Sequence, residues 1–588
     1  MYLFLQEIKE KFFQEKERWF IWVPVLFALG IGFYFSLSFE PSIWITLGLI
    51  EALIVLAIIF RFNQSALFVI AVASLPLFGF TYVQLRAVSL SENLEKDLPE
   101  NLYVSAAVSD MDYSYRGKPR LFLEDAKDYD GNEIKGKIRV VLNSNKTDVK
   151  VGDCIETVLE VQRPFSPSIV DGYQFSRKAF FEGVSWSGFP LARIISTECE
   201  KKTSAMGGFH SIVQFLRMKV VEKINKVIPN KDEAGIAHAI VAGQQGLVSE
   251  KIYEDYRDSG LAHFLSISGL HMTMIAGLMF FFVRLIIALI PPLAVRYDSK
   301  KIAAVLSIFV AFLYLLISGS AVPAQRAFIM IFIVLLGVLF YRQAISMKNI
   351  AWAALIVLLI SPESLVGPSF QMSFAAVFCL IAFYERHATK VHNILDRGRW
   401  FNIVLLYILG ILITDLVASL ATLPFAVYHF NRIAVYTTLG NFLAGPIICL
   451  LIMPFILLSL LLMPLGLEAF ALKLMGYGIK AVNYTTHYVA SMDGASQQVV
   501  SMPTWGLVLI VFGALWLSIW KLNWRFFGWI GIVLGALSVF TVTPPDVVVN
   551  GEKRLIAVKD NSGNLVILPA RWAGFDKKQC WKRRQVIV

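Results

Sequence analysis

Residues 450–467 read LLIMPFILLSLLLMPLGL and contain no charged side chain. A bilayer core of about 30 Å is crossed by roughly 20 apolar residues in an α-helix, so this run and its flanks predict a membrane span. A second uncharged run, AWAALIVLLI, occupies residues 351–360. The chain of 588 residues is 56% hydrophobic and only 16% charged, which leaves too little polar surface for a soluble protein. We therefore expect a polytopic α-helical membrane protein.

Further apolar runs indicate how often the chain crosses the membrane. Three lie near 20–38, 43–60 and 65–85. About ten more lie near 263–290, 302–318, 324–341, 349–361, 368–384, 402–427, 436–463, 466–490, 505–520 and 526–541. Runs 349–361 and 368–384 are short, and we expect re-entrant or broken helices there. The pattern predicts about thirteen spans.

The distribution of Lys and Arg predicts an orientation. The formal net charge of +11 would suit a nucleic-acid partner, but in a membrane protein such an excess usually marks cytoplasmic loops. Basic residues occur in the N-terminal segment and in loops 296–301, 341–348, 385–399 and 521–525, whereas loops 39–42, 361–368 and 491–503 lack them. Arg432 is an exception. The alternation predicts a cytoplasmic N-terminus and places 87–205 and 543–588 outside the cytoplasm.

The polar stretch 87–205 has the pattern of a small β domain. Strand-length segments that alternate or run apolar are LYVSAAVS, RLFLEDA, KIRVVL and IETVLEVQ, with FPLARIIS as a further candidate. DYDGNEIKG supplies turn residues between two of them. Five short strands suit a small barrel, and the oligonucleotide-binding (OB) barrel is one option. The expected fold class is thus a polytopic α-helical membrane protein with an inserted all-β, OB-like extracytoplasmic domain.

These patterns divide the chain into five parts. The expected parts are a cytoplasmic segment with three transmembrane helices (1–86), the β domain (87–205), an amphipathic helical connector (206–262), a domain of about ten spans (263–542) and a short extracytoplasmic tail (543–588).

The stretch HFLSISGLHM, which begins at His263, places polar groups at the start of an apolar run. In one helix, at about 100° per residue, His263, Ser266 and His271 fall within a sector of about 140°. Ser268 belongs to the same stretch, and Gly269 lies off that sector, where a neighbour could approach closely. Ionisable residues within a membrane usually face a bundle interior or a water-filled cavity. This stretch is a candidate for pore lining, with interhelical hydrogen bonding as the alternative.

Polar side chains on other spans could converge with this stretch. Arg326, near an apparent span start, could line a mouth and touch phosphate or could anchor the helix at the interface. Asp415 lies deeper and needs a partner, for which Arg326 or a histidine is a candidate. Asn441 in an apolar run implies an internal hydrogen bond. The predicted polar core comprises His263, Ser266, Ser268, Gly269, His271, Arg326, Gln371, Ser373, Asp415, His429 and Asn441.

The outside domain contains residues that could contact DNA. Aromatic side chains can stack on bases, and basic ones can contact phosphate, although acidic and basic residues are roughly balanced here. The candidates are Tyr103, Tyr113, Tyr115, Arg120 and Arg139, and the alternative is that the aromatic ones fill a small core. Cys154 and Cys199 both fall in this domain, and we predict a disulfide between them.

The sequence gives little support to metal or cofactor chemistry. Ser266 or Ser268 with His271 could form a nucleophile and base, but no third group or oxyanion site can be identified. Two histidines eight residues apart do not match H-E-x-x-H. No histidine follows His487, which argues against a histidine-rich metallohydrolase site in 543–588. We expect no bound metal, no cofactor and no enzymatic activity.

Several motifs resemble those of the ComEC family of bacterial competence proteins. GLAHFLSISGLHMTM resembles the central signature of that family, and VPAQRAFIM, FQMSFAAVF and YHFNRIAVYTTLGNFLAGP follow in the same order. GDCIETVLEVQRPFSPSIVDGYQFSRKAFFEGVSWSG resembles the end of the outside OB-like domain of the family. PPDVVVNGEKRLIAVKDNSGNLVILPARWAGF resembles only the opening of a metallo-β-lactamase-like domain, without its metal-binding histidine motif.

The resemblance implies a channel in the bacterial inner membrane that passes single-stranded DNA into the cytoplasm. It also implies a cytoplasmic ATP-driven translocase as a partner, because no P-loop motif occurs in this sequence, and a periplasmic DNA receptor. Membrane lipid surrounds the protein, and a homo-oligomer is an open alternative. Two other functions remain: an intramembrane hydrolase that uses Ser266 or Ser268 with His271, and a transporter of another anionic solute.

Overall fold

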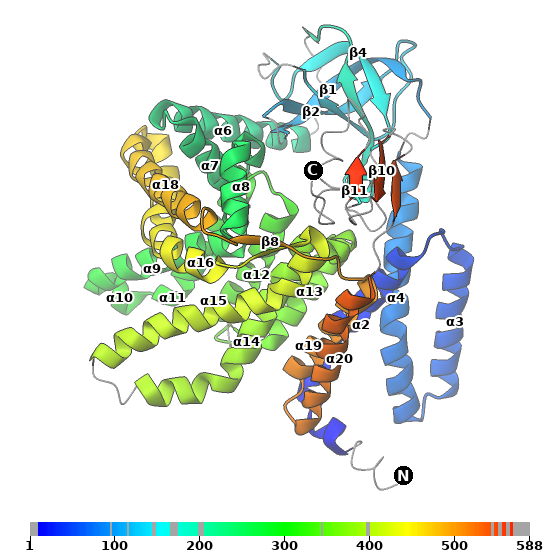
Figure 1. Ribbon diagram of the computed structural model, residues 1–588, viewed down its shortest axis with the longest axis vertical. Helices are drawn as coiled ribbons and strands as arrows, with labels where there is room; N and C mark the ends of the chain where they lie inside the picture. The colour runs from blue at the N-terminus through cyan, green and yellow to red at the C-terminus, as the bar shows by residue number, and fades with distance from the viewer. Residues whose placement is uncertain are drawn as a thin grey trace.

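The computed structural model describes residues 10–94, 97–114, 117–143, 149–164, 174–197, 205–342, 345–395, 400–542, 546–550, 555–559 and 565–567. Helices form most of the chain, and a six-stranded sheet lies at one end of the molecule (Figure 1). The N-terminal segment lies at the end of α2 and α4 that is far from this sheet (Figure 1). The first helices are α2 (Trp19–Ser36), α3 (Ile43–Ile59) and α4 (Gln64–Glu92).

The described residues include nine helices that are long and apolar enough to cross a membrane. These candidate spans are Lys16–Ser36, Gln64–Glu92, Gly269–Leu289, Ser299–Ile317, Val322–Leu339, Pro368–His387, Ile408–Phe430, Thr437–Leu465 and Asn523–Thr541. Three shorter apolar helices are Ile43–Ile59, Met347–Ile360 and Thr504–Ile519. The chain is thus a multi-pass membrane protein, as its composition predicts.

The bounds of several spans differ from those expected. Run 368–384 belongs to α14 (Pro368–Leu395), a helix of 28 residues, so the expectation of a short or broken helix was wrong there. Run 349–361 forms α13 (Met347–Ile360), which has only 14 residues. Run 466–490 forms α18 (Glu468–Ala490), which is not among the nine candidate spans because its lysines and polar residues lower its hydropathy.

The remaining helices of this half follow one another with short connections. They are α9 (Gly269–Leu289), α10 (Pro291–Arg296), α11 (Ser299–Ile317), α12 (Val322–Leu339), α15 (Trp400–Phe430), α16 (Thr437–Ile447), α17 (Met453–Leu462), α19 (Thr504–Ile519) and α20 (Gly528–Leu537). A π-helical turn, Ile448–Ile452, joins α16 to α17, so that one span, Thr437–Leu465, combines both helices. Short strands β7 (Arg432–Ala434) and β8 (Ser496–Gln498) pair antiparallel between distant loops.

The two largest apolar cores among the helices have different members. The larger core contains buried residues of α9, α11, α12, α16, α17 and α18 and of the preceding connector. A second core joins α2 and α4 to α13 and α14. Helices α2 and α4 approach most closely at two glycines: a Cβ atom on Gly30 would lie 1.7 Å from the Pro76 carbonyl oxygen, and one on Gly79 would lie 2.1 Å from that of Phe27. Small residues at such crossings are typical of membrane helices.

The connector 206–262 contains three helices with different surroundings. They are α6 (Ala205–Val227), α7 (Lys231–Ala242) and α8 (Glu250–Asp258). An amphipathic pattern was expected throughout, but every residue of α7 from Ala234 to Ala242 is buried. Helix α7 therefore belongs to the core of the helical half.

The β domain confirms four of the predicted strands. They form β1 (Asn101–Tyr113), β2 (Pro119–Lys127), β3 (Lys137–Val141) and β4 (Cys154–Gln162). The fifth candidate, FPLARIIS, is divided between β5 (Val184–Pro190) and β6 (Ile195–Thr197), and a helix that was not predicted, α5 (Phe175–Phe181), precedes β5. The sheet order is β1-β2-β3-β5-β4-β6, and β1 also pairs with β4. The pairings therefore form a closed ring of β1, β2, β3, β5 and β4, with β3 and β5 parallel.

The tail contributes a small three-stranded sheet. Strand β10 (Leu555–Lys559) pairs antiparallel with both β9 (Val547–Asn550) and β11 (Leu565–Ile567). Strands β10 and β11 are thus the two arms of a β-hairpin.

Candidate functional site

The stretch HFLSISGLHM is not one helix. A 3₁₀ turn, η3 (Ala262–Leu265), is followed by extended backbone at Ser266, and α9 begins only at Gly269. The expected sector shared by His263, Ser266 and His271 is therefore wrong, since it assumed continuous helix from residue 263. Ser268 is the N-cap of α9 instead: its side chain accepts from the backbone N–H of His271, and its own N–H donates to Nδ1 of His271 over 3.4 Å.

His271 faces the protein interior at the first turn of α9. Its side chain is fully buried, and its ring stacks on Phe264 with 5.2 Å between ring centroids. Nδ1 lies 3.2 Å from Oγ of Ser268, whereas Nε2 has no hydrogen-bond partner among the described residues. Gly269 does not mark a close helix contact as expected, because a Cβ atom there would meet nothing within 4 Å. Ser266 is half-buried.

The hydrogen-bond partner of Asp415 on α15 is a residue that was not predicted for it. Nδ2 of Asn441, on α16, donates to Oδ1 of Asp415 over 2.5 Å, which confirms the internal hydrogen bond expected for Asn441. Oδ2 of Asp415 is buried without a hydrogen-bond partner among the described residues. The predicted pairing of Asp415 with Arg326 was wrong. A histidine lies near, as predicted, because the charge of Asp415 acts on His263. Nδ1 of His263 donates to the Gly260 carbonyl oxygen over 3.1 Å.

Arg326 on α12 is the most buried cation of the predicted set. Its side chain is only 4% exposed and donates a hydrogen bond to Oγ of Ser369, in the first turn of α14. Among the described residues, its Nε has no hydrogen-bond partner and no carboxylate forms an ion pair with it. A buried guanidinium without a counter-ion is costly, so this site is electrostatically suited to an anion.

Gln371 and His429 join α14 to α15 near Arg326. Nε2 of His429 lies 2.7 Å from Oε1 of Gln371, whose Nε2 donates to the carbonyl oxygen of Leu365 over 2.9 Å. Ser373, also predicted for this set, is half-buried on the same helix. Side-chain hydrogen bonds therefore connect α12 to α14, α14 to α15 and α15 to α16 in succession.

The hydrogen-bonded polar residues lie at two different depths along the helices and do not converge at a single place. His429 and Asp415 are fourteen residues apart on α15, which corresponds to about 21 Å along a helix axis. Arg326, Ser369, Gln371 and His429 form an outer group, near the ends of their helices. Asp415 and Asn441 lie deeper and near His263. We call the first set the outer polar group and the second the inner polar group.

Sequence reasoning did not find the acidic partners of Arg432. Its Nη2 lies 2.5 Å from Oδ1 of Asp258 and its Nη1 lies 3.6 Å from Oε2 of Glu254, both on α8. Burial raises the pKa of Asp258, against the opposing effect of the Arg432 charge, and burial also lowers the pKa of Arg432. The i,i+4 spacing of the two acids on α8 was the available signal. This pairing explains why Arg432 departs from the loop-charge pattern.

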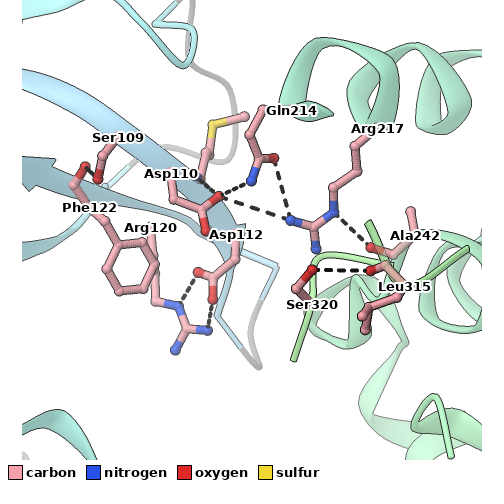
Figure 2. Close-up of polar contacts among 11 residues, drawn as sticks. Ser109, Asp110, Asp112, Arg120, Phe122, Gln214, Arg217, Ala242, Leu315 and Ser320 are labelled. Carbon is pink, nitrogen blue, oxygen red and sulfur yellow. Dashed lines mark hydrogen bonds and ion pairs between the residues drawn. The ribbon is translucent and has the colours of Figure 1, made fainter. Parts of the chain in front are cut away.

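A second network that the sequence did not reveal joins α6 to the β domain. Figure 2 shows Arg217 of α6 extended between Asp110 of β1 and the end of α7. Its Nε donates to the carbonyl oxygen of Ala242 over 2.8 Å, and Gln214 donates to Asp110 over 2.7 Å. Burial lowers the pKa of Arg217, partly offset by the charge of Asp110. Gly319 has φ +78, and a Cβ atom there would lie 2.5 Å from Nη2 of Arg217.

The predicted DNA-contacting residues of the β domain have different surroundings. Arg120 forms a bidentate pair with Asp112 at 2.6 Å. Arg139 is 9% exposed, bonds Ser187 over 2.9 Å and stacks on Phe175, so the structure removes it from the candidate DNA surface.

Of the three aromatic candidates, Tyr103 lies beside an exposed ring. Tyr103 is half-buried, with 5.8 Å between its ring centroid and that of Tyr129, which is 83% exposed. Burial raises the pKa of Tyr113, which ends β1. Tyr115 lies outside the described residues.

Cysteine and metal-ligand chemistry is limited in the part of the chain that the structure describes. Cys154 is disulfide-bonded, but Cys199 lies outside the described residues, so the pairing between them stays a prediction. Within the described ranges, no group of three or more His, Cys, Asp or Glu side chains could hold a metal ion.

The fold and these sites define the class of this protein: it is a multi-pass membrane protein with two polar groups between its helices. Residues 240–524 match the family model described as Competence protein. This segment, just under half of the chain, is similar to the competence protein family, and the match includes every residue of the outer and inner polar groups. No solved structure matches this chain.

Curated relatives extend this comparison. ComE operon protein 3 of Bacillus subtilis is 24% identical over 54% of this chain and 37% of its own length. Recombination protein 2 of Haemophilus influenzae is 24% identical over 44% and 33%, respectively. Competence protein ComA of Neisseria gonorrhoeae is 33% identical over 32% and 27%. The matched segments thus span between a quarter and two fifths of the length of these relatives.

Proposed function

We propose that this protein is a channel in the bacterial inner membrane that passes single-stranded DNA into the cytoplasm during competence. The observation that carries the proposal is Arg326, which is 4% exposed, bonded to Ser369 and without a carboxylate partner among the described residues. The names of the relatives link the family to competence and recombination. DNA uptake is the process in competence that requires a membrane path.

The charge of Arg326 matches the chemistry of a DNA backbone. Each nucleotide carries one phosphodiester charge, and guanidinium groups bind phosphate oxygens through two parallel N–H donors. Nε of Arg326 is a buried donor without a partner, so a phosphate could satisfy it. The neighbouring Gln371–His429 pair can exchange hydrogen bonds without adding charge.

The β domain would receive DNA before the membrane domain does. We infer that the closed ring of β1, β2, β3, β5 and β4 is an OB-like barrel, whose order it shares. Tyr103 and Tyr129 offer an edge-to-face aromatic pair at its surface for base stacking. Arg120, which is bound to Asp112, would contact phosphate only by exchanging that partner.

The proposal includes an orientation and partners. The N-terminus is placed in the cytoplasm and the β domain outside it, in accord with the alternating loop charges. A cytoplasmic ATP-driven translocase would pull the strand, a periplasmic receptor would deliver it, and the channel itself would perform no covalent chemistry. A homo-oligomer is compatible with this scheme.

A transformation assay tests the proposed function. A transformable host that lacks its own channel gene is complemented with this chain, with Arg326→Gln or with Arg326→Lys, and labelled DNA is followed at the surface and in the cytoplasm. The matched control is Arg342→Gln, an exposed cation after the last turn of α12. We expect Arg326→Gln to reduce import at least tenfold with surface capture and protein level unchanged. Normal import by Arg326→Gln would refute the role of Arg326, and failure of the unaltered chain to restore import would refute the channel.

An intramembrane hydrolase is the second candidate, because Oγ of Ser268 lies 3.2 Å from Nδ1 of His271. That distance is compatible with a nucleophile and base. The same contact is part of the N-cap of α9, however, and His271 is fully buried. A transporter of another anionic solute is the third possibility, and competition by single-stranded DNA for the β domain separates it from the channel.

A further inference from the structure

A cavity of about 570 Å³ lies among helix ends in the half of the membrane domain built from α2, α13, α14 and α19. It is bounded by the start of α2, the start of α13, the middle of α14 and the connection from α19 to η7 (Asn523–Phe527). Its charged lining consists of Arg18, Lys348, Arg386, Lys521, Arg525, Glu17 and Glu385. Five cations therefore face two carboxylates, and the outer and inner polar groups contribute nothing to this cavity.

The positive charge of the cavity is only partly neutralised. Arg18 lies 2.8 Å from Oε2 of Glu385 in an ion pair. Three of the cations are exposed and form no ion pair with any described residue: Lys348, Arg386 and Lys521. The charges of Arg525 and Arg18 act unfavourably on Arg386, whereas that of Glu385 acts favourably. A bound anion with more than one negative charge would relieve this repulsion.

The cavity lies beside aromatic residues that are typical of a membrane interface. Trp516, Trp520 and Trp524 form a cluster in which the ring centroids of Trp520 and Trp524 are 4.6 Å apart. Trp22 joins this cluster, with its ring centroid 5.9 Å from that of Trp520. Tryptophan is enriched at the level of lipid headgroups, where one part of its ring is apolar and the other is wet.

A buried carboxylate holds one wall of the cavity in place. Glu15, which is 6% exposed, accepts hydrogen bonds from the backbone N–H groups of Lys521 and Leu522 over 2.7 and 3.0 Å. It also accepts from Nε1 of Trp524 over 2.9 Å. Glu15 therefore fixes the turn after α19, so that Lys521 is presented at a defined position at the rim.

We propose that this cavity binds the phosphate-containing headgroup of an anionic phospholipid. Basic pockets between membrane helices on the cytoplasmic side are suited to such headgroups. The four segments that supply the cations belong to the set that the loop charges predict for the cytoplasm, and tryptophans such as those beside the cavity are enriched at headgroup depth. The proposal is independent of DNA transport.

Lipid retention by the full chain provides the test. The protein is purified in detergent, mixed with defined ratios of cardiolipin, phosphatidylglycerol and phosphatidylcholine, and the retained lipid is measured by native mass spectrometry. The variant carries Lys348→Gln, Arg386→Gln and Lys521→Gln. Each cation near a lipid surface changes binding by about fivefold, so we expect cardiolipin and phosphatidylglycerol retention to fall at least about tenfold while phosphatidylcholine is unchanged.

The control removes the same charge at three exposed positions away from the cavity. It carries Arg61→Gln, Arg296→Gln and Lys300→Gln, three residues that do not line the cavity. Equal loss in both variants would overturn a specific site, since net charge alone would explain it. Displacement of the lipid by inorganic phosphate at millimolar concentration would assign the cavity to a free anion, and displacement by a single-stranded oligonucleotide would assign it to DNA. Either displacement would overturn the lipid proposal.

Discussion

Nη1 of Arg217 on α6 lies 4.0 Å from Oδ1 of Asp110 on β1, so a buried cation of the helical half contacts a carboxylate of the β domain. The Arg217 side chain is 6% exposed and that of Asp110 is 36% exposed. Because Arg217 also bonds Ala242 and packs against Gly319, it joins β1, α7 and the loop before α12. Together with Gln214, which donates to the same carboxylate over 2.7 Å, Arg217 connects the β domain to the helical half.

Arg217→Lys should therefore weaken that connection. A lysine cannot bond the Ala242 carbonyl and approach Asp110 at the same time, because it lacks the planar fork of guanidinium. We expect a loss of about 1–3 kcal/mol, seen as a lower thermal midpoint of the purified protein and faster proteolysis between the two parts. Lys219→Gln on the exposed side of α6 is the matched control. A midpoint equal to that of the control would contradict the role given to Arg217.

The Asp415–Asn441 pair should show energetic coupling between α15 and α16. Its 2.5 Å hydrogen bond involves a carboxylate, and such bonds contribute about 1.5–3 kcal/mol. We expect Asp415→Ala to cost less than Asn441→Ala, because the second leaves a partly buried carboxylate without its donor. The double variant should be less destabilised than the sum of the single ones. Thermal unfolding of all four proteins measures the coupling, and additive effects would show that the pair contributes nothing.

Much of the architecture follows from the sequence because burial repeats with a local period. Leu102, Val104, Ala106 and Val108 are all buried on β1, as alternation predicts. The predicted span began at residue 263, six residues before α9, because it was placed by apolar content alone. A serine before Gly-Leu-His was an available signal for the N-cap at Ser268.

Side-chain partners were less predictable, because they depend on how helices rotate and cross. Asp415 and Asn441 meet across two helices separated by the β7 region, and neither residue type specifies the other. Arg217 reads as a surface residue of an amphipathic connector, but β1, the end of α7 and the loop at Gly319 all lie against it in the fold. Long-range contacts of this kind carry no periodic signal along the chain.

Ser268→Ala distinguishes a helix cap from a catalytic serine. Removal of an N-cap costs about 1 kcal/mol, so a channel should keep most of its DNA import and lose a few degrees of thermal stability. A hydrolase would lose all activity. Ser268→Thr preserves the capping oxygen and serves as the control. Transformation frequency and thermal midpoint are measured together, and complete loss of import by a stable Ser268→Ala protein would favour the catalytic reading.

His238 on α7 should make stability depend on pH. It is 2% exposed and shares a 2.8 Å hydrogen bond with Asn225, and burial lowers its pKa from 6.5 to about 4. Between these values the unfolded chain binds a proton that the folded chain does not. The stability contributed by neutral His238 is thus fully present above pH 6.5 and falls as the pH drops towards 4, by about 3 kcal/mol in total.

Carboxylates also titrate in this range, so the measurement compares the unaltered protein with His238→Gln, which cannot be protonated but can still bond Asn225. Thermal midpoints are recorded from pH 7.5 to 4.5 in the same detergent. We expect the two curves to run parallel above pH 7 and to diverge below it, with the unaltered protein losing stability faster because its unfolded state gains a proton. Parallel curves over the whole range would mean that His238 is protonated as easily in the folded protein as in the unfolded chain, and that α7 is open to water.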